Sequence, residues 1–386
     1  MEPIIAPVSL DLIKAELTPA KKLRDTNKSH NEIYILTAHD SPNIMREIGR
    51  LREEAFRDSG GGSGLSMDID EFDTMESPYH QLIVWDPEAE KILGGYRYIF
   101  GNEIKLDEKG QPQLATAHMF HFSDKFITEY LPYTIELGRS FVAPEYQSSK
   151  AGAKALFALD NLWDGLGALG IERPDMKYFF GKMTMYPEYN REARDLIQHF
   201  LWKHFGDKEN LVTAMDPIVI ETPAEYMDSL LYEKEFKDDY KLLNAEVRKR
   251  GVNIPPLVNS YMSLSPTMKV FGGGINHEFS EAEETCILIT YDEIHENKKD
   301  RHINSFINEK IAIIRQRFPK WAEMMGDNLT DMFNHKREKM QEKMAANKKK
   351  RQEKRQVRKN NKDVKKAQKM AAKESKKATK STKTDK

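Results

Sequence analysis

The sequence predicts a mixed α/β fold. A run with helical periodicity covers about 42–58, and two strand-like runs, YHQLIVWD and KILGGYRYIF, follow it at 79–86 and 91–100. Further along, TIELGRSF at 134–141 alternates like a strand and precedes a helical pattern over about 148–169. With 386 residues, 39 % of them hydrophobic, the chain is long enough for one large domain or two ordinary ones.

The first of these helices has clear signals at both ends. Ser41 is a typical N-cap residue, and Pro42 is a typical first helical residue. The glycine-rich run SGGGSG at 59–64 ends the helix, and MDIDEFD follows with three aspartates. A helix that leads into a β-hairpin is the simplest interpretation. Apolar residues recur inside the helix at the expected spacing: Ile44, Ile48, Leu51, Ala55 and Phe56.

The rest of the chain alternates between helix and strand signals, without an internal repeat and without a clean linker before about 330. The expected elements, in chain order, are a short helix over 120–132, a strand over 134–141, a helix over 148–169, a strand over 176–185, a helix over 187–206, a charged helix within 224–250, a loop with at least one strand over 253–294, and a helix over 300–318.

The net charge of −1 conceals an uneven distribution of charge. Residues 336–386 contain 22 Lys and Arg against 6 Asp and Glu, whereas residues 1–335 contain 38 against 55. We therefore expect a folded domain over 1–335 and a basic tail, partly helical or disordered, over 336–386. The tail can serve solubility, attract anionic lipid or help to dock an acidic carrier protein. Because it has hardly any stacking aromatic residue, nucleic acid is a poor candidate for its partner.

The composition argues against several classes of protein. The single cysteine, Cys286, rules out an internal disulfide framework, and the N-terminus lacks a secretory pattern. No apolar run approaches the roughly 20 residues that cross a bilayer, so we expect a cytoplasmic protein. The histidines form no compact ligand pattern, so no metal site is expected. Ser63 follows a helix instead of a strand, which gives hydrolase chemistry little support.

The stretch TIELGRSFVAPEYQ places a carboxylate and a guanidinium among apolar residues. In a regular strand Glu136 and Arg139 point to opposite faces, and a β-bulge near Gly138 would bring them together. They could form a structural ion pair, or Glu136 could take a proton from an amine. The helix that begins near Ser148 could bind a phosphate at its N-terminus, although Gly152 is the one glycine there.

These residues resemble a known family. ELGRS, then VAPEYQ, then a helix is similar to the acyl-donor motif of the GNAT superfamily, in which a splayed strand and a helix N-terminus hold pantetheine and its phosphate. The segments over 31–73, HQLIVWD, GGYRYIF and IPPLVNSYMSLSPTMKVFGGG resemble the hemolysin-like N-acyltransferases that make lyso-ornithine and glycine lipids. These enzymes are related to acyl-homoserine-lactone synthases. The similarity covers about residues 23–295.

The resemblance implies a GNAT-like fold with a central, mostly antiparallel mixed sheet flanked by helices. It also implies transfer of a fatty acyl chain, often 3-hydroxylated, from acyl carrier protein or coenzyme A to the α-amino group of a small amino acid such as glycine or ornithine. The thioester is a co-substrate, and no tightly bound cofactor is expected. The product is the precursor of a membrane aminolipid, which suggests an enzyme peripheral to the inner membrane face.

Site residues follow from the same resemblance. The catalytic candidates are Glu136, Arg139, Asp70 and Asp73, with Glu136 as general base and an aspartate holding the ammonium group. Arg52 and Arg97 are the candidates for binding the acceptor carboxylate. Acyl-donor binding is assigned to Phe141, Val142, Gln147, Ser148, Lys150 and Gly152.

Two of these assignments have competing interpretations. Asp68, Asp70 and Asp73 could simply cap a turn, and the run lacks the glycine and terminal glutamate of a calcium-binding EF-hand. Lys150 stands where the wider superfamily has a glycine, so tight binding of a pyrophosphate is in doubt and a carrier-protein donor fits better than free coenzyme A. Two other functions stay open: an acyl-homoserine-lactone-type synthase using S-adenosylmethionine, and a non-catalytic acyl- or RNA-binding protein.

Overall fold

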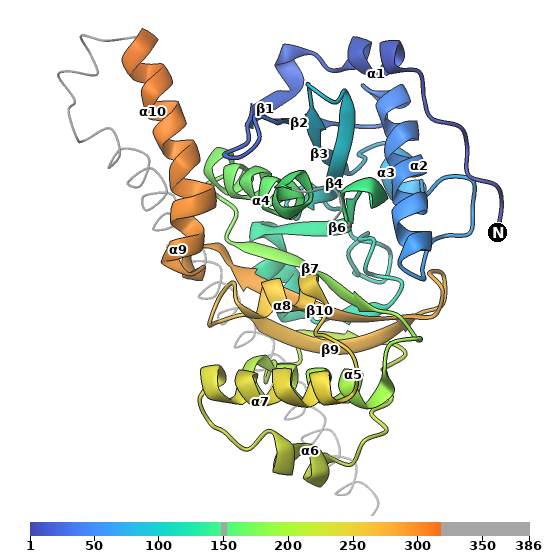
Figure 1. Cartoon of the computed structure of the whole chain (residues 1–386), viewed down its shortest axis with the longest axis vertical. Helices are drawn as coiled ribbons and strands as arrows, with labels where there is room; N and C mark the ends of the chain where they lie inside the picture. The colour runs from blue at the N-terminus through green and yellow to red at the C-terminus, as the bar shows by residue number, and fades with distance from the viewer. Residues whose placement is uncertain (148–152, 318–386) are drawn as a thin grey trace, which may run out of the picture. The chain divides into compact units, whose positions relative to one another are not determined.

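The structure, a computed structural model, describes residues 1–147 and 153–317. Its main feature is an eight-stranded sheet in the order β1-β2-β3-β4-β6-β7-β10-β9 (Figure 1). Neighbouring strands are antiparallel except β6 and β7, which are parallel. The mostly antiparallel mixed sheet flanked by helices that the sequence predicts is therefore confirmed. The domain boundary at 335 and the basic tail lie outside the described residues.

The bounds of the elements are as follows. The strands are β1 Lys22–Asp25, β2 Glu32–Leu36, β3 His80–Asp86, β4 Lys91–Phe100, β5 Phe120–Phe122, β6 Thr134–Val142, β7 Tyr178–Met185, β8 Val212–Ala214, β9 Lys269–Asn276 and β10 Ala282–Thr290. The helices are α1 Leu10–Glu16, α2 Pro42–Asp58, α3 Glu71–Thr74, α4 Ala153–Glu172, α5 Arg191–Phe205, α6 Ala224–Leu230, α7 Phe236–Lys249, α8 Pro256–Met262, α9 Glu296–Lys299 and α10 Ser305–Arg317.

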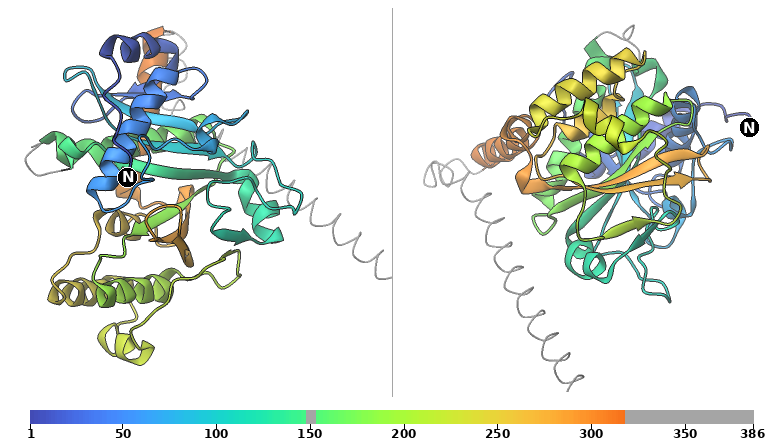
Figure 2. Two further views of the ribbon diagram at one scale, coloured as in Figure 1. Left: turned by 90° about the vertical axis from the view of Figure 1, so that its right-hand side faces the viewer. Right: turned by 90° about the horizontal axis from the view of Figure 1, so that it is seen from below.

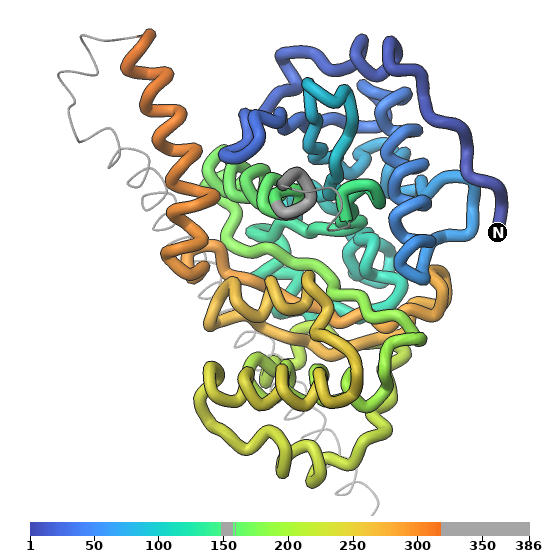
Figure 3. The backbone as a smooth tube through the Cα atoms, viewed as in Figure 1, coloured from blue at the N-terminus to red at the C-terminus, as the bar shows by residue number. Residues whose placement is uncertain are grey.

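Helices cover both faces of the sheet. Alternation along β3 separates Gln81, which binds Arg52 of α2, from Leu82, which lies against Gly165 of α4. The two helices therefore pack on opposite faces. Helix α5 lies on the same face as α4. It packs with α6 and α7 in a group beside β9, and both views of Figure 2 show this group. The N-terminal residues run along the loop that follows α2, where Glu2 N donates to Gly64 O at 2.8 Å (Figure 3).

Strands β6 and β7 pair over only three positions. Thr134, Ile135 and Glu136 face Tyr178, Phe179 and Phe180. Beyond that point β6 continues its pairing with β4, and β7 continues with β10, so the two strands part. Each then presents a backbone edge that lacks its neighbour in the sheet, and such edges need other hydrogen-bond partners. We call this opening the β6–β7 gap.

A β-bulge lies on β6 beside the gap. Gly138 pairs with Arg97 and Phe141 pairs with Gly95, so β6 has one residue more than β4 between the two pairs. Arg139, inside the bulge, has φ of +48°, a left-handed conformation that side-chain-bearing residues seldom adopt. The bulge expected near Gly138 is confirmed, and it moves Arg139 to the face that carries Arg97 and Glu136.

Several expected elements need correction. The short helix expected over 120–132 is strand β5 followed by a π-helical turn at Phe126–Tyr130, because Phe120 and Phe122 are fully buried and β5 pairs with β8. The charged segment 224–250 forms two helices, α6 and α7, because Lys203 Nζ donates hydrogen bonds to the carbonyl oxygens of Leu231 and Glu233, which lie between the two helices.

Other expectations hold closely. The helix at 42–58 and the hairpin strands at 80–86 and 91–100 have the expected bounds to within one residue. The helix expected over 187–206 begins at Arg191, where Asn190 accepts a capping hydrogen bond from Ala193 N at 3.0 Å. Within 1–147 and 153–317, no helix is long and apolar enough to cross a membrane.

Candidate active site

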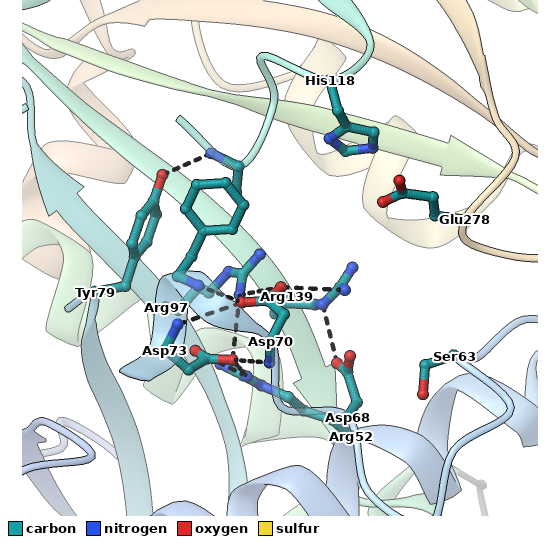
Figure 4. Close-up of polar contacts among 12 residues, drawn as sticks. Arg52, Ser63, Asp68, Asp70, Asp73, Tyr79, Arg97, His118, Arg139 and Glu278 are labelled. Atoms are coloured by element: carbon teal, nitrogen blue, oxygen red, sulfur yellow. Dashed lines mark hydrogen bonds and ion pairs between the residues drawn. The ribbon is translucent and has the colours of Figure 1, made fainter. Parts of the chain in front are cut away.

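A buried cluster of alternating charges lies on the α2 face of the sheet, beside the β6–β7 gap (Figure 4). Three separate elements supply its arginines, and the short segment that leads into α3 and includes it supplies its three aspartates, Asp68, Asp70 and Asp73. Arg52 comes from α2, Arg97 from β4 and Arg139 from the bulge of β6. The fold thus brings together six of the polar residues that the sequence singled out.

The inner half of the cluster centres on Asp73. Arg52 Nη1 lies 3.1 Å and Arg97 Nη1 lies 3.2 Å from Asp73 Oδ2. Gln81 bridges this pair by donating to Asp73 and accepting from Arg52 Nη2 at 2.5 Å. Burial alone would raise the pKa of Asp73, but the charges of Arg52 and Arg97 outweigh burial and hold this pKa well below its usual range. Asp73 is therefore a fixed anion.

The outer half is partly open to solvent. Arg97 Nη1 lies 2.7 Å from Asp70 Oδ1, and Arg139 Nε lies 2.9 Å from Asp68 Oδ2. Arg139 also reaches Asp70 Oδ2 at 3.5 Å and stacks on Phe279, with its guanidinium carbon 5.0 Å from the ring centroid. The side chains of Asp70 and Arg139 are 28 % and 19 % exposed, whereas that of Arg52 is 0 % exposed.

The aspartates also fold the loop that carries them. Asp70 is the N-cap of α3 and accepts from Phe72 N at 3.0 Å and Asp73 N at 3.3 Å. Asp73 in turn accepts from Asp70 N at 3.2 Å, which completes a capping box. The capped-turn interpretation of MDIDEFD is confirmed, and it coexists with the ion pairs because each carboxylate accepts several hydrogen bonds.

The sequence suggested Arg52 and Arg97 as substrate-binding groups, but in the structure both arginines bind residues of the cluster. Arg52 is fully enclosed, and both of its terminal nitrogens already bind Asp73 or Gln81. Arg97 is 3 % exposed and binds Asp70 and Asp73. In this structure both arginines hold aspartates in position, and Arg139 is the arginine of the cluster with an exposed side.

Glu136 lies deeper on the same face, 1 % exposed. It accepts hydrogen bonds from the hydroxyl groups of Tyr79 and of Thr116, the latter at 2.7 Å. Burial raises the pKa of Glu136, and these two hydrogen bonds oppose the rise only in part. Since Arg139 binds Asp68 and Asp70 instead, the interpretation of Glu136 and Arg139 as an ion pair is wrong, although the bulge puts them on one face.

Sequence reasoning missed a second charged pair across the gap. Lys182 of β7 forms an ion pair with Glu284 of β10, and Asn276 Nδ2 donates to Glu284 at 3.2 Å. Burial would raise the pKa of Glu284, but the charges of Lys182 and Arg139 lower it overall, so Glu284 stays ionised. The available signal was the same as for Glu136: each is a charged residue within a strand that is largely buried.

The acyl-donor candidates are only partly described. Phe141 and Val142 form the end of β6 beyond the bulge, and Gln147 Nε2 donates to Val142 O at 2.7 Å. Ser148, Lys150 and Gly152 lie outside the described residues. Figure 4 shows His118 and Glu278 beyond Arg139, and Ser63 beside Asp68. Among the residues with described placement, no group of three His, Cys, Asp or Glu side chains is arranged to hold a metal ion.

The cluster makes a prediction about stability. Asp73→Asn should lower the free energy of unfolding by about 3–5 kcal/mol, because it leaves two buried arginines without their shared anion. Asp70→Asn is the matched control and should cost much less, since Asp70 is partly exposed and asparagine is an equally good N-cap. Urea unfolding followed by circular dichroism measures both changes. Equal losses for the two variants would contradict the central role of Asp73.

Comparison with known proteins identifies the family to which the chain belongs. Residues 51–156 match the family model described as an acetyltransferase (GNAT) domain, a range that contains all six cluster residues and Glu136. No solved structure matches the chain significantly.

Similar proteins give closer matches. The chain is 64 % identical over 309 residues to a glycine N(alpha)-acyltransferase of Phocaeicola vulgatus, covering 80 % of this chain and 95 % of that protein. It is 66 % identical over 307 residues to a glycine N(alpha)-acyltransferase of Bacteroides thetaiotaomicron, covering 80 % and 91 %. An L-ornithine N(alpha)-acyltransferase of Agrobacterium fabrum is 26 % identical over 225 residues, which cover 56 % of this chain and 67 % of that protein. The chain therefore belongs to the GNAT-type family of N-acyltransferases and is an enzyme.

Proposed function

We propose that this enzyme transfers a fatty acyl chain from acyl carrier protein to the α-amino group of glycine. The product would be an N-acylglycine, the precursor of a membrane aminolipid. The observation that carries the proposal is the 64–66 % identity, over more than nine-tenths of their length, to two proteins named glycine N(alpha)-acyltransferase. The relative named for ornithine is far less similar, at 26 % identity.

The charges around the β6–β7 gap suit a zwitterionic acceptor. An amino acid presents an ammonium and a carboxylate only a few bonds apart, so its site needs both signs of charge close together. Arg139 and Asp70 provide them on the β6 side, and Lys182 and Glu284 provide them on the β7 side. We assign the acceptor carboxylate to Arg139, whose planar fork matches two oxygens, and the ammonium group to Asp70.

Arg52, Arg97 and Asp73 would act through the groups that touch the acceptor. Arg97 binds both Asp70 and Asp73, and Asp73 binds Arg52. This chain fixes the orientation of the Asp70 carboxylate from behind. We therefore infer a positioning role for these three residues, in place of direct contact with the substrate.

The reaction requires an uncharged amine. Glu136 is our candidate for the general base, because burial raises its pKa and so makes it a better proton acceptor than an exposed carboxylate. The nitrogen lone pair attacks the thioester carbonyl, the N–C bond forms and the nitrogen gives up its proton to Glu136, which can return it to the leaving thiolate. Backbone N–H groups of β6 near Val142 would stabilise the oxyanion. Collapse then breaks the C–S bond, and the thiol leaves with a proton.

The donor assignment rests on the sequence after β6. Gln147 is followed by Ser148, Ser149 and Lys150, so the run lacks the glycines with which related enzymes surround a pyrophosphate. A phosphopantetheine arm carries one phosphate and needs fewer backbone contacts. This difference favours acyl carrier protein over coenzyme A.

The proposal predicts a specific product. Purified enzyme with a 3-hydroxyacyl carrier protein and an equimolar mixture of the twenty amino acids and ornithine should yield mainly N-acylglycine by mass spectrometry. Glu136→Gln should lower the rate by at least about a hundredfold while the circular dichroism spectrum is kept. Acylation of another amino acid would refute the glycine assignment, and a cyclised lactone product would favour the homoserine-lactone alternative.

The assignment of Arg139 has its own test. Arg139→Lys should raise the KM for glycine about tenfold and leave the KM for the acyl donor unchanged, since the planar fork is lost but the charge is kept. Arg50→Lys is the matched control, because Arg50 binds Glu47 and Glu54 of its own helix and no residue of the cluster. An unchanged KM for glycine in Arg139→Lys would place the acceptor carboxylate elsewhere.

We also propose that residues 336–386 hold the enzyme near anionic lipid at the inner membrane face, where an N-acylglycine would partition. Their excess of Lys and Arg supports this role. Deletion of 336–386 should reduce sedimentation with phosphatidylglycerol vesicles at low salt, with little change in the rate on soluble donors. Equal sedimentation of the full and truncated chains would refute the membrane role.

A further inference from the structure

Three segments far apart in the sequence meet around Arg139 on the α2 face of the sheet. They are the glycine-rich loop over 59–64, Tyr186 directly after β7, and the turn over 277–281 between β9 and β10. Each of them contacts Arg139 or another of the three. We call these residues the collar. They bound the region in which the proposed function places the acceptor carboxylate.

The turn between β9 and β10 is fixed on two sides. Phe279 is buried, and its ring centroid lies 5.0 Å from the guanidinium carbon of Arg139. The same ring packs edge-on against Phe56 near the end of α2, with ring centroids 5.3 Å apart. Ser280 Oγ donates to Gly62 O at 3.3 Å. The turn therefore contacts both Arg139 and the glycine-rich loop.

A buried carboxylate fixes the glycine-rich loop. Glu53 of α2 accepts hydrogen bonds from Ser63 N at 2.9 Å, from Ser63 Oγ at 2.7 Å and from Gly64 N at 2.8 Å. Glycine gives a backbone unusual freedom, because no side chain restricts its dihedral angles. The three hydrogen bonds to Glu53 remove much of that freedom here, so the loop forms a firm wall.

Tyr186 packs directly on this loop. A Cβ atom at Gly61 would lie 2.4 Å from Tyr186 Cε1, closer than carbon atoms that are not bonded approach each other. The tyrosine ring thus occupies the space that a side chain at position 61 would need. Because the loop behind it is fixed, the ring cannot move back to make room for a larger ligand.

The ring of Tyr186 faces the charged groups on both sides of the gap. Residues at alternate positions of β7 share one face, and Lys182 and Thr184 both use that face to bind Glu284. Tyr186 is the next residue on it. Burial raises the pKa of Tyr186 to about 12, the charge of Glu284 adds to this rise, and the charge of Arg139 opposes it. Both charges therefore act on its hydroxyl group.

We propose that the ring of Tyr186 limits the acceptor to amino acids with little or no side chain, and so selects glycine. This inference rests on the proposed function, because it assumes that Arg139 binds the acceptor carboxylate. The first carbon of an amino-acid side chain lies only a few bonds from the carboxylate group. A side chain therefore needs space beside Arg139, where the collar leaves the ring no freedom to withdraw. Overpacking of this kind is unfavourable.

The first test removes the ring. In Tyr186→Ala, the ratio of kcat/KM for L-alanine to kcat/KM for glycine should rise at least about tenfold, since one added carbon in a tight pocket discriminates by this much or more. The KM for the acyl carrier protein should not change. Tyr186→Leu should shift the ratio in the same direction by less, and it replaces Tyr186→Ala if that variant folds poorly.

Two controls separate the ring from other effects. Tyr186→Phe keeps the ring and should keep the wild-type ratio. Tyr232→Ala makes the same substitution at an exposed tyrosine and should also leave the ratio unchanged. An unchanged ratio in both Tyr186→Ala and Tyr186→Leu would overturn the proposal. So would an equal rise in Tyr186→Phe and Tyr186→Ala, because it would assign the selection to the hydroxyl group.

The second test measures binding without catalysis. Saturation-transfer difference NMR of the full-length enzyme, with glycine or L-alanine and no donor, should detect glycine alone with the wild type. With Tyr186→Ala it should detect both amino acids. Equal signals from glycine and L-alanine with the wild type would overturn the proposal.

The two tests also separate this inference from the proposed function. If the wild type forms no acylglycine, but L-alanine binds to Tyr186→Ala and not to the wild type, the size limit stands and the proposed function fails. If the wild type forms acylglycine, and Tyr186→Ala and Tyr186→Leu are equally selective for glycine, the size limit is wrong and the proposed function stands.

Discussion

The site depends on the point at which β6 and β7 stop pairing, after Glu136 and Phe180. Parallel neighbours in a closed sheet satisfy each other's backbone, so parting them opens a gap whose edges need new partners. The bulge on β6 lies directly beside this opening and moves Arg139 to the α2 face. The gap, the bulge and the change of side-chain direction together place charges on one face and apolar side chains, among them Leu137 and Phe179, on the other.

Such a concentration of buried charge is stable only if each charge has partners. Asp73 serves two arginines and a backbone N–H group, and it remains ionised although burial opposes ionisation. Arg52 is fully buried, and both of its terminal nitrogens donate to residues of this network. The inner residues are fully paired, so in the proposed function the groups that contact the substrate are the outer ones, Asp70 and Arg139.

The sequence predicted much of this arrangement, and the failures have physical reasons. Local signals sufficed for the helix at 42–58, the hairpin, the capped turn at Asp70 and the bulge near Gly138. Enclosure of Arg52 could not be predicted, because it depends on Asp73 and Gln81, residues far from it in sequence. The Lys182–Glu284 pair joins strands about a hundred residues apart. Strand β5 forms because tertiary packing of Phe120 and Phe122 overrides helical signals on the residues after them.

A crystal structure of the enzyme bound to N-palmitoylglycine, the proposed product, tests the proposed function most directly. If the proposed function is correct, the amide lies in the β6–β7 gap and the carboxylate contacts Arg139 on the α2 face. An amide outside the gap, or a carboxylate that does not contact Arg139, would contradict the proposed function.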